Sequence, residues 1–290
     1  MTISRGAAQH VAVILVSLLT ACSQASDRKL VDSFARFSLS LESLEQWRLP
    51  AQLREISGLA LTPDGRLLAV CDESAIVYEL DYKGGKIVKA FALGNPVERG
   101  DFEGIAYMDE TVFLVTSDGR LYASAEGADG ERVAYREYRT GIGQFCEIEG
   151  LAEHVETKIL LIACKERRKS SKGVDLSVFA WSPSTRTLND DERIALPEEK
   201  IEKMLGKKHI NPSGIAVDPK TGNLFAIAAQ QRAILELGPN GDLMDAVILP
   251  LTFRHRQPEG VALTQDGQLL IADEGSGRRA TLSIYQENKQ

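Results

Sequence analysis

Side chains that carry oxygen recur at two fixed positions before five regularly spaced glycines. The glycines are Gly58, Gly104, Gly150, Gly214 and Gly260. Three residues before them stand Glu55, Asp101, Glu147, Asn211 and Gln257, and one residue before them stand Ser57, Glu103, Glu149, Ser213 and Glu259. Alternate residues of a strand point to the same side, and Ca²⁺ takes six to eight oxygen ligands. The pattern therefore predicts a Ca²⁺ site formed by Glu55, Asp101, Glu103, Glu147, Glu149 and Glu259.

The same pattern has a structural explanation that stays open. Glycine recurs wherever strands crowd around a narrow axis, and polar residues before it can cap and hydrogen-bond the loops. In that case Glu103, Glu149 and Glu259 would repel one another without a cation, and their pKa values would rise.

Two histidines are candidates for acid–base chemistry beside these carboxylates. His209 and His255 each lie five residues before a motif glycine. Histidine titrates near neutral pH, so both are candidate general bases, although histidines in surface loops often have no such role. The basic run 165–173 is expected at the same place, as a solvated hairpin tip or a grip for an anion or a membrane.

The glycine repeat also predicts the fold. Successive glycines are 46, 46, 64 and 46 residues apart, and each unit continues with a turn and further apolar runs. Four strands in about 45 residues are typical of a β-propeller blade. The chain is therefore expected to be an all-β, five-bladed propeller, with six blades as the alternative. The last unit has only three strands, so residues 44–49 are expected to supply its fourth and close the ring.

One short helix is expected in the longer third unit, between blades three and four. Pro197 stands at its start and Gly206 at its end, with Ile201, Met204 and Leu205 on one face.

The N-terminus predicts export and a lipid anchor. Residues 1–21 combine a basic start with a short apolar run, as in a signal peptide. The segment Leu19-Thr20-Ala21-Cys22 resembles the lipobox of bacterial lipoproteins, which implies a diacylated Cys22. Ser23 then implies an outer-membrane address facing the periplasm, and residues 22–43 are expected to be the lipidated cysteine and a tether to the domain at 44–290.

The remaining cysteines are Cys71, Cys146 and Cys164, so at most one disulfide forms, and buried strand thiols are the alternative. The net charge of −7 argues against a nucleic-acid partner. A Gly-x-Ser-x-Gly elbow and a phosphate loop are both absent from the sequence.

The series Glu-Ile-Ser-Gly58-Leu-Ala, Asp-Phe-Glu-Gly104-Ile-Ala and Pro-Ser-Gly214-Ile-Ala-Val-Asp resembles the SdiA-regulated family of bacterial envelope proteins. The resemblance implies an envelope-attached β-propeller without an established activity. More distantly, Pro-Glu-Gly260 followed by Leu-Leu-Ile-Ala-Asp is similar to NHL-repeat and gluconolactonase-type propellers, some of which hold Ca²⁺ and hydrolyse lactones. Two functions are expected: a lipid-anchored module that binds a protein or small molecule at the channel mouth, or a metal-dependent hydrolase of a lactone or phosphoester.

Overall fold

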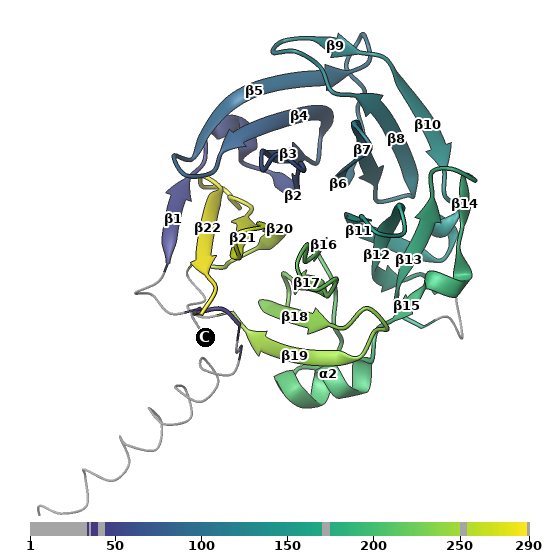
Figure 1. Cartoon of the computed structure of the whole chain (residues 1–290), viewed down its shortest axis with the longest axis vertical. Coiled ribbons are helices and arrows are strands. Elements are labelled where there is room, and N and C mark those ends of the chain that lie inside the picture. The colour runs from purple at the N-terminus through teal and green to yellow at the C-terminus, as the bar shows by residue number, and fades with distance from the viewer. Residues whose placement is uncertain (1–33, 35, 40–43, 170–174, 250–253, 289–290) are drawn as a thin grey trace, which may run out of the picture.

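The computed structural model describes residues 34, 36–39, 44–169, 175–249 and 254–288. Within these ranges the strands form five antiparallel blades arranged around a central axis (Figure 1). The predicted five-bladed β-propeller is thus confirmed, and the six-bladed alternative is not adopted.

Each blade runs outward from the axis in chain order. The innermost strands are β2 (Ile56–Leu61), β6 (Phe102–Met108), β11 (Cys146–His154), β16 (Gly214–Val217) and β20 (Pro258–Leu263). The second strands are β3 (Leu67–Cys71), β7 (Thr111–Thr116), β12 (Ile159–Arg167), β17 (Leu224–Ala228) and β21 (Gln268–Asp273). The third strands are β4 (Ser74–Asp81), β8 (Arg120–Ala125), β13 (Ser177–Ser182), β18 (Ala233–Leu237) and β22 (Thr281–Gln286). The outer strands are β5 (Lys86–Leu93), β10 (Tyr135–Arg139), β14 (Thr187–Leu188) with β15 (Ile194–Ala195), β19 (Leu243–Ile248) and β1 (Glu45–Arg48). A short strand, β9 (Arg132–Val133), extends blade one beyond β5 by parallel pairing.

The hydrophobic core lies between neighbouring blades. Second strands are covered on both faces, so they are nearly continuous apolar runs such as Leu-Phe-Ala-Ile-Ala in β17. Outer strands have one face in solvent and alternate, as β5 does. Between blades one and two, for example, Val70 and Phe91 pack in one cluster with Leu114 and Tyr122.

The motif glycines allow the inner strands to meet at the axis. A Cβ atom on Gly104 would lie 2.6 Å from the backbone nitrogen of Leu151 in the next blade. On Gly214 it would lie 2.5 Å from the carbonyl oxygen of Glu259. Crowding of inner strands therefore accounts for the glycines, as the structural explanation expects.

The ring closes through the N-terminal strand. β1 pairs antiparallel with β22, with Trp47 opposite Leu282, and the Leu49 amide donates a 2.9 Å hydrogen bond to the Ala280 carbonyl. In Figure 1, β1 lies beside β22 as the outer strand of blade five. The predicted closure by residues 44–49 is confirmed.

The predicted helix is α2 (Glu198–Leu205), which precedes blade four and packs on β19. It ends at Gly206, which adopts the left-handed conformation. Ile201 and Leu205 are buried, but Met204 is 48% exposed, so Met204 does not belong to the packed face as expected. Three single-turn 3₁₀ segments complete the described helices: η1 (Ala51–Leu53), η2 (Ile142–Gln144) and η3 (Asp190–Glu192).

Part of the predicted tether packs on the propeller. Phe34, Phe37 and Leu39 are each 2% exposed and join the cluster between blades four and five around Phe225. Arg36 lies over the ring of Phe225 and forms ion pairs with Asp218, Glu236 and Glu287. The domain therefore starts upstream of residue 44, which corrects the predicted boundary. Cys22 and the rest of the leader and tether lie outside the described residues.

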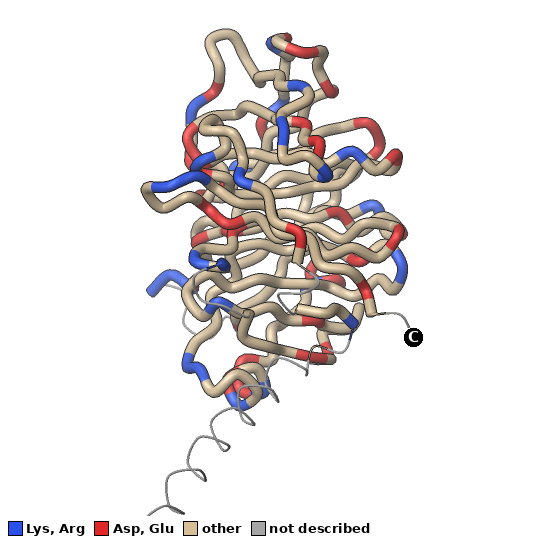
Figure 2. Tube along the Cα trace, turned by 90° about the vertical axis from the view of Figure 1, so that its left-hand side faces the viewer, with Lys and Arg blue, Asp and Glu red and all other residues tan. Residues whose placement is uncertain are grey.

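A disulfide joins β11 to β12. It links Cys146 to Cys164, whereas Cys71 is a free thiol. The alternative of two buried thiols at Cys71 and Cys164 is therefore wrong for Cys164. In the part of the chain that the structure describes, no helix is long and apolar enough to cross a membrane. Viewed edge-on, the propeller carries acidic and basic residues in the loops of both faces (Figure 2).

Candidate functional site

The residue before the motif glycine lies at a break in strand pairing. In β2, β6 and β20 the pairing register shifts at this residue, so Ser57, Glu103 and Glu259 sit at bulges. In β11 a shift between Ile148 and Leu151 includes Glu149. A β-bulge turns a side chain out of the normal alternation. The fold thus provides one redirected side chain per bulged strand near the end of the channel where the inner strands begin.

At the position before the motif glycine, the two serines form hydrogen bonds between blades, unlike the glutamates. The Ser57 hydroxyl donates a 2.7 Å hydrogen bond to the Phe102 carbonyl, and the Ser213 hydroxyl donates a 2.7 Å bond to the Pro258 carbonyl. Each serine therefore links its inner strand to the next blade. Both are buried, at 6% and 3% exposure. The structural explanation is correct for the serines.

The position three residues before the glycine is mostly engaged in local contacts. Asp101 accepts a hydrogen bond from Ser117, and Asn211 accepts one of 3.0 Å from Gln231. Gln257 donates to Glu274, and Glu55 is paired with its neighbour Arg54 at 3.4 Å. Of the six predicted Ca²⁺ ligands, Glu55, Asp101 and Glu147 are the more exposed ones, and they form an outer rim. We call the deeper group, formed by Glu103, Glu149 and Glu259 with Lys165, the acidic mouth.

Lys165 brings a positive charge into the acidic mouth. Its ammonium contacts the Glu149 carboxylate and lies 3.4 Å from Glu147. Burial would lower the pKa of Lys165, but its contacts with Glu149 and Glu147 raise that pKa above its ordinary value. Lys165 follows Cys164, and Glu147 follows Cys146, so the disulfide clamps the two strands that carry this ion pair.

The three deep glutamates hold protons more tightly than ordinary carboxyls. Burial and the neighbouring Glu149, Asp101 and Glu259 raise the pKa of Glu103 to about 9. Burial and Glu149 raise the pKa of Glu259 to about 8. Burial raises the pKa of Glu149 to about 7, and the contact with Lys165 opposes this rise. The direction of these shifts agrees with the repulsion expected for this trio without a cation.

A cavity of about 320 Å³ opens at the acidic mouth. Its lining includes Glu149, Lys165, Asn211, Ser213, Gln257 and Glu259. Among the described residues, no three His, Cys, Asp or Glu side chains form a ready set of metal ligands. The sequence analysis places Lys165 only in a basic run. Its contact with Glu149 depends on the strand register, in which Glu147 pairs with Glu166 and Ile148 with Cys164. A single sequence does not predict this register.

The two candidate histidines do not join the carboxylates. The ring of His255 is fully buried, with Nδ1 2.7 Å from Asp273 and Nε2 2.6 Å from the Tyr285 hydroxyl. A ring enclosed in this way has no access to a ligand at the mouth, which corrects the expectation for His255. His209 lies in an exposed loop, where its amide donates to Glu202 and its carbonyl accepts from Gln231.

Solved structures share the propeller architecture. A glutaminyl cyclase from Myxococcus xanthus matches with a TM-score of 0.56 and 13% identity, over 84% of this chain and 96% of that one. A streptogramin B lyase matches with a TM-score of 0.50 and 10% identity, over 89% of this chain and 100% of that one. Identities this low show a common fold and nothing about activity.

A family model also matches part of the chain. The model of the SdiA-regulated family matches residues 185–290. These residues span the last part of blade three, α2, blade four and the three C-terminal strands of blade five. Two of the five glycine motifs, those at Gly214 and Gly260, fall inside the matched residues. The match confirms that this chain resembles the SdiA-regulated family, as its repeat motifs predict.

Proposed function

We propose that the protein is an envelope-bound binding module whose acidic mouth takes up a cation, with Ca²⁺ as the ion. The observation that carries the proposal is the imbalance of charge there. Three carboxyl groups come together, of which Glu149 is buried and Glu103 and Glu259 are partly buried, and Lys165 forms an ion pair with Glu149 but not with the other two. Glu103 and Glu259 are left with pKa values of about 9 and 8.

A cation would relieve this imbalance. Unit charges about 4 Å apart repel by roughly 4 kcal/mol at an effective dielectric of 20. Carboxylate oxygens are the ligands that Ca²⁺ prefers, so the donor chemistry fits. In this structure Lys165 forms an ion pair with Glu149. Ca²⁺ would therefore bind Glu103 and Glu259, and Glu149 would join them only after its ion pair with Lys165 breaks.

The alternative function, hydrolysis of a lactone or phosphoester, has no specific support. His255 is enclosed by Asp273 and Tyr285, and within the described ranges no hydrogen bond or ion pair joins the His209 ring to the acidic mouth. A binding role needs only the carboxylates and the cavity beside them.

Calcium titration of the chelator-treated protein, followed by thermal melting, tests the proposal. Ca²⁺ should raise the melting temperature because it binds only the folded state, with a gain of about 2.7 kcal/mol at 100 times the dissociation constant. Glu103→Gln and Glu259→Gln should abolish this rise. In chelator, both variants should be at least as stable as the wild type, because glutamine cannot take on the negative charge that burial and the neighbouring carboxylates oppose.

Glu199→Gln, an exposed change on α2, is the matched control and should keep the full calcium response. Mg²⁺ at the same ionic strength separates specific binding from screening. If calcium does not shift the wild type and Glu103→Gln strongly destabilises the chelated protein, the carboxylates are structural and the proposal fails.

A further inference from the structure

A second cavity, larger than the first, opens at the other end of the channel, where the inner strands end. Its volume is about 640 Å³, within the range of small-molecule sites. We call it the turn-face pocket, because the turns between first and second strands, such as Thr62–Gly65 and Thr264–Asp266, form its rim.

A ring of aliphatic side chains forms the floor of the turn-face pocket. The residue after each motif glycine contributes to it: Leu59, Ile105, Leu151, Ile215 and Val261. Each of these side chains is at most 4% exposed. The floor ring lies between the turn-face pocket and the acidic mouth, so the two cavities are separate sites.

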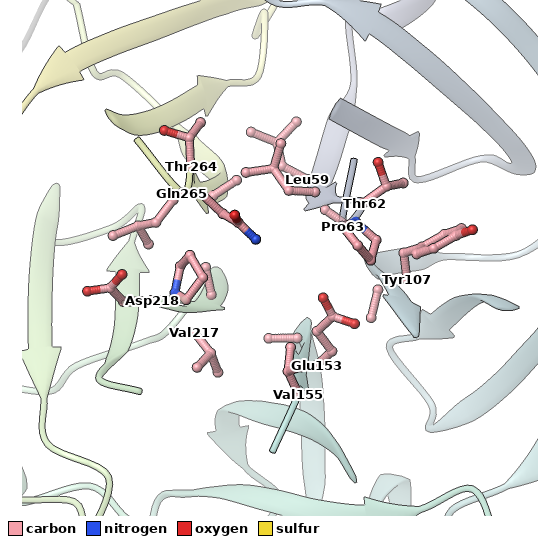
Figure 3. Close-up of a pocket in the computed structure, with 18 of the residues that line it drawn as sticks. Leu59, Thr62, Pro63, Tyr107, Glu153, Val155, Val217, Asp218, Thr264 and Gln265 are labelled. Carbon is pink, nitrogen blue, oxygen red and sulfur yellow. The ribbon is translucent and has the colours of Figure 1, made fainter. Parts of the chain in front are cut away.

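The next ring forms the wall and contains one exception. Two residues further along each inner strand stand Leu61, Tyr107, Glu153, Val217 and Leu263. Four of these are apolar or aromatic, and the blade-three member is a carboxylate. Figure 3 shows the Glu153 side chain projecting into the space between Leu59, Tyr107 and Val217.

The Glu153 carboxylate has no partner among the described residues: none of them donates a hydrogen bond to it or forms an ion pair with it. Nearby basic groups are already committed. Lys158 pairs with Asp109 at 3.0 Å, and Lys220 pairs with Glu287 at 2.7 Å. Burial and the neighbouring Asp109 carboxylate raise the pKa of Glu153 to about 7.

We propose that the turn-face pocket binds a small molecule with an apolar body and one ammonium group, which pairs with Glu153. The floor and wall rings supply apolar surface for the body of the molecule. Glu153 is the single wall position where a charge is placed, so it selects a cation over a neutral or anionic head group.

Calorimetric titration near pH 8 with three matched probes tests this proposal: 4-phenylbutylamine, 4-phenylbutanol and 5-phenylvalerate. At that pH both the amine and the Glu153 carboxylate are mostly charged. The amine should bind at least about tenfold more tightly than the alcohol, a factor equal to about 1.4 kcal/mol, and the acid should bind most weakly.

Glu153→Gln should reduce the amine affinity about tenfold and leave the alcohol affinity unchanged. Glu156→Gln, an exposed carboxylate on the same rim, is the matched control and should leave every affinity unchanged. Glu103→Gln, at the acidic mouth, should also have no effect on amine binding.

Three results would overturn the proposal: equal affinities for the amine and the alcohol, an unaltered amine affinity in Glu153→Gln, or loss of amine binding in Glu103→Gln. The last result would place the amine at the acidic mouth. Because calcium binding is measured separately and depends on Glu103 and Glu259, either proposal can fail without the other.

Discussion

Among single residues, the carboxylates of the acidic mouth are in an electrostatically unfavourable environment. Glu103, Glu149 and Glu259 lie beside one lysine, and burial together with repulsion from nearby carboxylates raises all three pKa values. The serines in the two other blades avoid this cost, because their hydroxyls donate to neighbouring carbonyls. The residue before the motif glycine therefore lowers the stability of the fold in three blades and raises it in the two serine blades. Such local costs are typical of functional sites.

These pKa values predict that the chelated protein becomes less stable as pH rises from about 5 to 9. Above the ordinary carboxyl pKa of 4.5, the unfolded chain has lost protons that the folded state still holds. The folded state binds more protons, so the free energy of unfolding falls over this range, by about 1.4 kcal/mol per pH unit for each carboxyl that stays protonated only in the folded state, until the pH passes that carboxyl's folded pKa of about 7, 8 or 9. Urea unfolding at several pH values measures this.

Glu103→Gln should flatten this pH dependence, and Glu199→Gln should leave it as in the wild type. Carboxyls with lowered pKa values, such as Asp64 and Glu126, act below about pH 4.5 and do not interfere. Stability that increases over pH 5 to 9 would contradict the electrostatic picture.

At the element scale, β1 holds the ring closed. It covers the edge of β22, and the chain then leads to Leu49 and Leu53, which are both fully buried beside blades one and five. Without β1, blade five would be a three-stranded sheet with a bare edge. Phe34, Phe37 and Leu39 add a second attachment of the N-terminal region, between blades four and five.

Deletion of residues 44–49 should lower the melting temperature by roughly 10 °C or more. Loss of the strand pairing and of the buried Leu49 side chain is worth about 4 kcal/mol, and 1 kcal/mol shifts a domain of this size by about 2–4 °C. Deletion of residues 23–33, which lie outside the described part of the chain, is the control because it spares Phe34, Phe37 and Leu39. Equal melting temperatures for the two deletions would refute closure by β1.

At the scale of the whole molecule, the propeller presents two different ends. One end holds the acidic mouth around Lys165, and the other holds an apolar floor and wall in which Glu153 is the one carboxylate, with further carboxylates such as Glu156 at the rim. The floor ring separates them. The disulfide between Cys146 and Cys164 is typical of proteins outside the reducing cytoplasm, and it supports the proposed envelope location.

Anchoring through Cys22 is the prediction for the whole molecule. Cys22→Ser should move the protein from the membrane fraction to the soluble fraction, because the thiol is the proposed site of diacylation and acyl chains supply the membrane affinity. Cys71→Ser, which removes the free thiol of blade one, should leave the protein in the membrane fraction. Membrane retention of Cys22→Ser would rule out the lipid anchor.

The amino-acid sequence alone predicts the propeller, with five blades and six as the alternative, and the strand that closes it. Each blade repeats the same local pattern of glycine, apolar runs and turns, so local information is sufficient there. It also indicated that Glu103, Glu149 and Glu259 face one mouth, because they occupy equivalent positions in equivalent blades.

The contacts of these groups become visible only in the folded molecule. Lys165 reaches Glu149 because of the bulged pairing of β11 with β12, and His255 is enclosed by Asp273 and Tyr285 from β21 and β22. Such contacts depend on register and on packing between strands, which a repeat pattern leaves open. The exceptional place of Glu153 in an apolar wall likewise emerges only when five inner strands are aligned around one axis.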